Sequence, residues 1–235
     1  MLFGVINYLQ WHICHLVARA FWLYREDNRQ HVFEQIHNLR IRIIHMATAQ
    51  KLPKLINGVA VDSLFATIDA IKATPSIAKF KFRIKNQWED AGQNSSTVDK
   101  FSGAGGEQSR PKPFVLAADE PPILLGKDAA ANPVEHLLHA LASCLTTSMV
   151  YHAAARGIQI EEVESTLEGD LDLQGFLELD KNVRRGYQGI RVNFKVKADV
   201  SDEKLQEVIQ LGPGHSPVFD SLVNGVPVTV SGERL

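Results

Sequence analysis

The longest regular pattern of apolar residues predicts one central helix over residues 133–156. This stretch is rich in Leu and Ala, and no charged residue follows Glu135 until the last position of the helix. Asn132 is a favourable N-cap, Pro133 suits the first helical position, and Gly157 stands where a C-terminal cap belongs. Because the helix is apolar around most of its circumference, we expect it to be buried on more than one side.

The other elements alternate between helices and strands without a strict βαβ order. Helical spacing of apolar residues predicts helices at Asp62–Lys72, with Asp62 as N-cap, at Asp202–Leu211, with Ser201 as N-cap, and at Pro217–Val223. Alternation or short apolar runs predict strands at Lys79–Trp88, Phe114–Ala117, Ile160–Asp172, Ile190–Ala198 and Val226–Val230. Residues 90–113 are expected to form turns or a hairpin around Thr97–Phe101, and Gly212–Gly214 a turn. This mixture favours an α+β fold with antiparallel sheets.

Residues 1–45 differ in composition from the rest of the chain. They contain five Arg, no Lys and three acidic residues, a net charge of +5−3 = +2, whereas residues 46–235 carry +20−24 = −4. Polar residues interrupt the apolar run at 2–24, and no early cation marks a secretory signal, so we expect neither a membrane span nor a leader. We predict an N-terminal extension over 1–45, either foreign to the natural product or a loosely packed helix, followed by one domain over 46–235.

Overall composition narrows the class of protein. The 235 residues are 45% hydrophobic and 22% charged, with a net charge of −2, which is typical of a globular chain and gives no basic surface for nucleic acid. Two cysteines without a C-x-x-C pair exclude a disulfide scaffold and a zinc ribbon. His136 and His139 lack a third ligand nearby in the sequence, so we expect no metal and no cofactor. We expect a cytoplasmic protein without membrane or nucleic-acid partners.

Cys144 is the residue that could carry chemistry. It lies halfway along the predicted helix, where a free cysteine commonly serves as a small buried hydrophobe and becomes reactive only if its thiolate is stabilised and accessible. Glu135 precedes it by nine residues, which corresponds to about 900° of rotation and about 13.5 Å of rise. The two side chains therefore face opposite sides of one helix. A carboxylate that assists Cys144 must come from elsewhere, and a two-fold partner helix could supply it.

Two segments resemble motifs of the OsmC/Ohr family, the osmotically inducible and organic-hydroperoxide-resistance proteins. Asn132-Pro133-Val134-Glu135 followed by a Leu/Ala run and Cys144 is similar to the family's central-helix motif, and Ser216-Pro217-Val218 stands where the family has Cys-Pro-Val. The resemblance implies an intertwined homodimer with curved antiparallel sheets around central helices. It also implies a thiol peroxidase in which the helix cysteine reduces an organic hydroperoxide and a second cysteine resolves the sulfenic acid.

The chain departs from that pattern at three positions. Ser216 replaces the resolving cysteine and cannot form a disulfide, and Cys14, in the N-terminal extension, is an implausible substitute. Val134 occupies the position of the family's catalytic Glu, with Glu135 one residue later. The turn at 89–94, where those members carry an activating Arg, has none, and Arg83 in the preceding strand is the nearest substitute.

Three functions remain open on this basis. The first is a one-cysteine peroxidase in which Cys144 and Glu135 are catalytic and an external thiol is the reductant. The second is a non-catalytic protein that binds a hydrophobic small molecule at the dimer interface. The third is a purely structural role for Cys144 in a stress-related dimer.

Overall fold

The computed structural model describes residues 33–40 and 54–234, which belong to two units that are treated separately. Residues 33–40 are helical, and their side chains are exposed. The expected boundary between residues 45 and 46 lies outside the described residues. Within the described parts of the chain, no helix combines the length and the apolar character needed to cross a bilayer.

The second unit is built around the predicted central helix, α4. The helices are α3 (Val61–Ala73), α4 (Pro133–Ala155), α5 (Leu173–Phe176), α6 (Asp202–His215) and α7 (Pro217–Val223), with short 3₁₀ helices at Pro75–Ala78 and Pro122–Leu124. The strands are β1 (Leu55–Ile56), β2 (Val59–Ala60), β3 (Lys85–Asp90), β4 (Gln93–Val98), β5 (Phe101–Gly103), β6 (Gly106–Gln108), β7 (Phe114–Ala118), β8 (Ile160–Asp170) and β9 (Gly189–Ala198). All paired strands are antiparallel, which confirms the α+β prediction.

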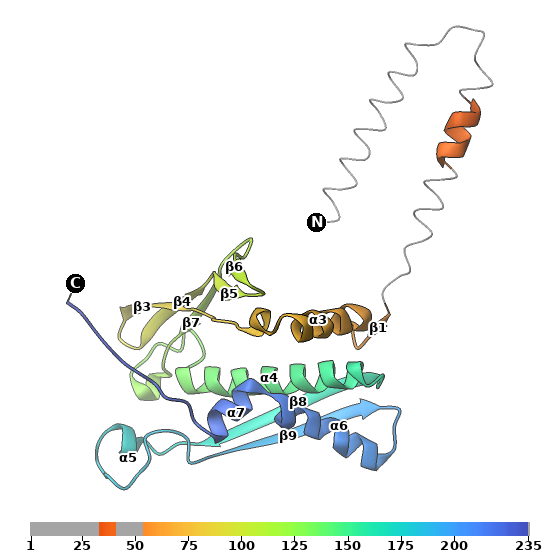
Figure 1. The fold of residues 1–235 in the computed structure, drawn as a ribbon. Helices are drawn as coiled ribbons and strands as arrows, with labels where there is room; N and C mark the ends of the chain where they lie inside the picture. The colour runs from red at the N-terminus through yellow and green to blue at the C-terminus, as the bar shows by residue number, and fades with distance from the viewer. Residues whose placement is uncertain (1–32, 41–53, 235) are drawn as a thin grey trace. The chain divides into compact units, whose positions relative to one another are not determined.

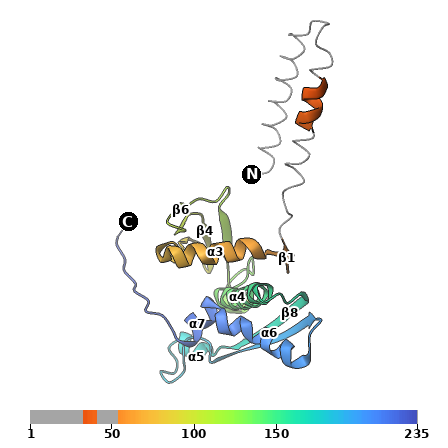
Figure 2. The same cartoon turned by 45° about the vertical axis from the view of Figure 1, so that its right-hand side comes forward.

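The main core lies between α4, α6 and the long β8–β9 hairpin (Figure 1). Met149 and Ala153 of α4 and Val208 of α6 are fully buried, and Ile160 closes the cluster from β8. Along β8 and β9 half-buried side chains alternate with exposed charged ones, so one face of this hairpin covers the helices and the other carries ion pairs. Figure 2 shows the same hairpin and α6 on one side of α4, with α3 on the other.

The tight β1–β2 hairpin is hydrogen-bonded to the segment that follows the C-terminal end of α4. Asn57 and Gly58, with φ of 54° and 76°, connect β1 and β2 as a two-residue turn that demands positive φ. The Asn57 side chain donates to the Ile158 carbonyl at 3.0 Å and accepts from the Ile160 backbone N–H at 2.7 Å. One side chain therefore joins this hairpin to the chain that leaves α4.

Helix α3, predicted at Asp62–Lys72, begins one residue earlier than predicted, and its N-cap residue differs. Ala60 is the N-cap of α3 and makes no side-chain cap bond, so the prediction of Asp62 as N-cap is wrong. The physical reason is that β2 runs directly into the helix. The Val61 N–H, which lacks a helical acceptor, donates instead to the Lys54 carbonyl at 3.1 Å.

The segment predicted as one half-buried strand, Lys79–Trp88, is divided. Only its last four residues, from Lys85 on, belong to β3, in the sheet β3-β4-β7. Lys81 makes an isolated bridge to Ser102. Its apolar side is exposed within this chain, with Phe82 at 69% and Ile84 at 60%. The polar residues 93–98, expected to be part of a turn region, form β4, and the hairpin expected around Thr97–Phe101 is instead β5–β6 with its turn at Ala104 and Gly105.

Two predictions about the C-terminal part are also wrong. Residues 212–214 do not form a turn, because α6 continues through them to His215. The absence of a side chain at Gly212 lets α6 approach α4 closely, since a Cβ there would lie 3.1 Å from the Leu145 carbonyl oxygen. This packing outweighs the hydrogen bond that Pro213 cannot make. The segment Val226–Val230 is not a strand, and Val228 and Val230 are 80% and 88% exposed.

Candidate functional site

The site is built on α4, whose first turn is fixed by a reciprocal cap. The Asn132 side chain accepts from the Glu135 N–H at 2.8 Å, and the Glu135 carboxylate accepts from the Asn132 N–H at 2.9 Å. This capping box confirms the predicted start of the helix, and such a cap contributes about 1 kcal/mol. It also gives the Glu135 carboxylate a defined position at the N-terminal end of α4.

Two aromatic side chains hold the same end of α4 against the rest of the fold. The Tyr187 hydroxyl donates to the Val134 carbonyl at 2.9 Å, and its ring occupies the space above Gly169, where a Cβ would lie 2.5 Å from it. The His136 imidazole donates from Nε2 to the Ala117 carbonyl at 2.9 Å. Burial first, and then the nearby Glu135 charge, raise the pKa of Tyr187. The helix start is therefore linked both to β7 and to the chain that enters β9.

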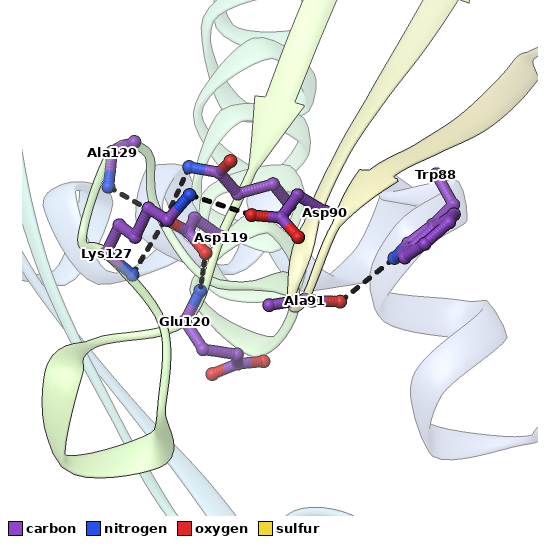
Figure 3. A network of polar contacts seen from close by, with 8 residues as sticks. Trp88, Asp90, Ala91, Asp119, Glu120, Lys127 and Ala129 are labelled. Carbon is purple, nitrogen blue, oxygen red and sulfur yellow. Dashed lines mark hydrogen bonds and ion pairs between the residues drawn. The ribbon is translucent and has the colours of Figure 1, made fainter.

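A buried carboxylate organises the loop that leads into α4. Asp119 is 1% exposed and accepts from the backbone N–H groups of Glu120 at 2.8 Å and of Lys127 and Ala129 at 3.1 Å each (Figure 3). The Gln93 side-chain amide donates to it at 3.2 Å, while Lys127 pairs with Asp90 at 2.8 Å. These contacts join the β3–β4 turn to the segment before α4.

The protonation of Asp119 follows from these donors. Burial by itself acts to raise its pKa, but the N–H groups of Ala129 and Glu120, the Gln93 amide and the Lys127 N–H outweigh burial and hold the pKa below the usual range. Sequence reasoning missed this residue. The available signal was an acidic residue placed directly after a short strand and before Pro121-Pro122, which does not specify its donors.

Cys144 lies in the middle of α4, as predicted. Its side chain is partly buried, and among residues 33–40 and 54–234 no hydrogen-bond or ion-pair partner is placed on its sulfur. Leu137 and Tyr151, seven residues before and after it, lie near the same face of the helix and are 36% and 49% exposed. The thiol therefore lies on a partly apolar flank that the described chain leaves open.

The two charged residues proposed to act on Cys144 are engaged elsewhere in the chain. Glu135 belongs to the capping box, about 13.5 Å of helix rise from Cys144. Arg83 forms a two-pronged ion pair with Glu107, at 2.9 and 3.1 Å, and donates to the Ser102 hydroxyl at 2.7 Å. Hydrogen bonds from Arg83 and Ser102 hold the pKa of Glu107 below its ordinary value. The structure does not bring Glu135, Arg83 and Cys144 together within one chain.

The position predicted for a resolving cysteine has a structural role here. Ser216 is 2% exposed and is the N-cap of α7, because its hydroxyl accepts from the Phe219 N–H at 3.1 Å. The preceding residue, His215, accepts at its backbone carbonyl from Ser148, at 3.3 Å. Ser148 follows Cys144 by one helical turn, so the α6–α7 junction lies along the same region of α4 as the thiol.

No cluster of three or more metal-ligating side chains occurs among the described residues. His136 and His139, the pair considered from the sequence, have separate partners: the Ala117 carbonyl for the first and the Ser143 hydroxyl, at 3.5 Å, for the second.

We predict that Asp119→Asn lowers the melting temperature by about 5 °C or more, because an amide NH2 group then faces backbone N–H donors. The matched control is Asp128→Asn, an exposed loop residue at φ 56° that Asn tolerates well. Since the folded pKa of Asp119 lies below 3.8, its contribution is complete above that pH and is lost as the pH falls through the folded value. Equal melting temperatures for the two variants would show that the Asp119 contacts do not stabilise the loop.

Part of the chain matches a known protein family, and its fold is similar to solved structures. Residues 126–231 match the family model of OsmC-like proteins. A search of curated proteins finds no significant match. The chain is similar to the crystal structure of an OsmC-like protein from Mycoplasma pneumoniae, with 18% identity and a TM-score of 0.48, over 64% of this chain and 94% of that one.

Two further solved structures are similar at comparable levels. A putative osmotic stress induced and detoxification response protein from Psychrobacter arcticus 273-4 shows 15% identity and a TM-score of 0.46, over 60% of this chain and 88% of that one. An organic hydroperoxide resistance protein OsmC from Legionella pneumophila shows 14% identity and a TM-score of 0.44, over 62% and 90%. The family match at 126–231 includes both motifs singled out in the sequence, and this part of the chain is similar to OsmC-like proteins.

Proposed function

We propose that this protein is a one-cysteine thiol peroxidase that reduces organic hydroperoxides with Cys144 and an external thiol. The observation that carries the proposal is the position of Cys144. It lies partly buried at the middle of α4, on an apolar flank, with no partner on its sulfur in the described chain. An apolar approach suits an organic hydroperoxide, and the partly exposed sulfur is accessible to it. The group that stabilises the Cys144 thiolate must then come from outside the described residues.

The proposed cycle has two halves. In the first, the Cys144 thiolate attacks the outer peroxide oxygen, the O–O bond breaks, and the alcohol leaves after taking up a proton. Cys144 is thereby oxidised to a sulfenic acid and the peroxide is reduced. In the second, one external thiol condenses with the sulfenic acid and releases water. A second external thiol then attacks the mixed disulfide, which regenerates the Cys144 thiol and releases the oxidised reductant.

Ser216 is the reason for proposing an external reductant. A serine cannot form a disulfide, and here its hydroxyl caps α7. The sulfenic acid at Cys144 must therefore be resolved by a thiol from outside the described chain. The proposal places the reaction in the cytoplasm, where such thiols are kept reduced.

We further propose that the functional form is a homodimer. Apolar side chains are exposed on α4 at Tyr151, on β7 at Val115 and in the extended C-terminal segment at Val228, where they are 49%, 67% and 80% exposed. Exposed apolar surface of this kind marks interfaces. In a two-fold dimer Glu135 of the partner subunit is the carboxylate available to Cys144, because Glu135 of the same chain faces away from it.

A second function is favoured by one observation, the aromatic cluster formed by the exposed Phe80 and Phe82 and the half-buried Phe101. Their ring centroids lie 5.4–6.3 Å apart, and Arg110 lies 5.3 Å from the Phe101 ring with a buried, unpartnered Nε. Such a cluster suits a hydrophobic small molecule that carries a negative group. If binding is the function, the Cys144→Ser variant binds the hydrophobic small molecule with the same affinity as wild type.

We predict that one equivalent of an organic hydroperoxide converts Cys144 to a sulfenic acid, trapped as its adduct with a 1,3-diketone and located by mass spectrometry. Cys144→Ser abolishes the adduct and thiol-dependent peroxide consumption. Cys14→Ser, which removes the other cysteine, is the matched control and retains both. A protein whose Cys144 stays unmodified, or whose Cys144→Ser variant consumes peroxide at the wild-type rate, contradicts the proposal.

We predict that sedimentation equilibrium gives about twice the chain mass of 26.1 kDa. Tyr151→Glu shifts the protein toward monomer, because it places a charge on the apolar flank of α4. The control is Thr166→Glu, an exposed position on the charged face of β8, which leaves the mass unchanged. A folded wild-type monomer at micromolar concentration rules out the dimer.

A further inference from the structure

Two imidazole rings stack where the end of α6 meets α4. The ring of His152, on α4, lies 3.6 Å from that of His215, the last residue of α6, with 28° between the ring planes. Beside them the Ser148 hydroxyl of α4 donates to the His215 carbonyl at 3.3 Å. The stacked pair and this hydrogen bond together connect the last turn of α6 to α4.

The hydrogen bonds of the pair define where its protons lie. Arg156 approaches Nδ1 of His152 with Nη1 at 3.3 Å, and a guanidinium only donates. Nδ1 of His152 therefore accepts, and the ring is neutral with its proton on Nε2. In His215, Nδ1 lies 3.1 Å from the Leu211 carbonyl, which only accepts, so this nitrogen carries a proton. Protonation of His152 at Nδ1 would turn an acceptor into a donor facing Arg156.

The charges around His152 all oppose its protonation. Burial lowers its pKa most, followed by His215 from α6 and Arg156 from its own helix. Within the described residues no carboxylate contributes to this shift. Arg156 also donates to the His152 carbonyl at 2.8 Å, so the guanidinium stays in place when the ring titrates. A proton on either ring therefore adds a second positive charge to a contact that already holds one.

We propose that His152, His215 and Arg156 form a pH-sensitive contact that holds the end of α6 on α4 at neutral pH and loosens when the solution becomes acidic. The proposal concerns the fold itself and holds whether or not Cys144 is peroxidatic.

Loosening of this contact is expected to affect the elements that follow α6 in the chain. Ser216 follows His215 directly and caps α7, and α7 itself packs on α4. A displacement of His215 is therefore transmitted to Ser216 and α7, the elements next to the Cys144 region of α4. Acidification is expected to change the access to that region while α4 and the β8–β9 hairpin keep their structure.

The pH range follows from the direction of the shift. In the unfolded chain His152 titrates near its ordinary value of 6.5, and in the fold its pKa is lower. The unfolded state binds more protons in the interval between the two values, so stability falls as the pH decreases from about 6.5 toward the folded pKa. Above that interval the contact is fully formed.

The direct test is a titration of the wild-type full chain by NMR of the histidine ring carbons. His152 is expected to titrate below 6.5, and hydrogen exchange of residues 209–223, corrected for the intrinsic effect of pH, is expected to increase between about pH 7.5 and about pH 5.5. Exchange in β8–β9 stays constant over the same interval. A His152 midpoint at or above 6.5, or equal exchange of residues 209–223 at both pH values, overturns the proposal.

A variant series provides the second test. His152→Phe keeps an aromatic ring for stacking and removes the titrating nitrogen that faces Arg156. The fall in melting temperature between about pH 7.5 and about pH 5.5 is expected to be smaller in this variant than in wild type. His139→Gln, which removes an exposed histidine from the same helix, is the matched control and keeps the wild-type pH dependence. If both variants retain the wild-type pH dependence, the contact is not the sensor. If His152→Phe does not fold, the titration of the wild-type chain still decides.

Discussion

The close packing of α6 on one face of α4 is the contact on which the other elements depend. Leu145 and Met149 are buried against α6, and the missing side chain at Gly212 sets how near the two helices approach. Burying apolar side chains of this size stabilises by about 1.5–3 kcal/mol each, more than a typical hydrogen bond between neutral groups. Because the β8–β9 hairpin completes the same core, α4 has one buried face and one open flank.

The polar contacts that join the ends of α4 to the rest of the fold do not involve Cys144. The capping box, Tyr187 and the Asp119 loop fix the first turn, and Asn57 joins the β1–β2 hairpin to the chain that leaves the last. Cys144, between them, lies on an exposed apolar flank and has no charged partner among residues 33–40 and 54–234. An α-helix separates Glu135 from Cys144 in both rise and direction. The chemistry proposed for the thiol therefore requires a second chain.

The sequence was most informative where a residue type has one local meaning. Asn132-Pro133 and Gly157 define the ends of α4, and the alternation at 190–198 defines β9. Asn57-Gly58 is an equally direct signal for a two-residue hairpin turn, but it was not used to predict the β1–β2 hairpin. The helix pattern also placed Cys144 in the middle of α4, as the structure has it.

Other features depend on tertiary contacts that local patterns do not contain. The continuation of α6 through Pro213 follows from packing on Leu145. The mostly polar segment β4 is a strand because it pairs with β3 and β7, and its sequence shows no alternation of apolar residues that would predict this. The donors to Asp119 come from residues up to 26 positions away. His152 and His215 stack across 63 residues, which no spacing rule predicts.

The most direct test of this account is subunit complementation between Glu135→Gln and Cys144→Ser. Gln at the third helical position keeps the capping box, so the first variant loses the carboxylate and not the helix start. Each variant alone is expected to show little thiol-dependent hydroperoxide reduction. After co-refolding, mixed dimers contain one Cys144 facing one intact Glu135 of the partner subunit, and activity is expected to return. A mixture no more active than the sum of its parts, or a fully active Glu135→Gln protein, would contradict the account.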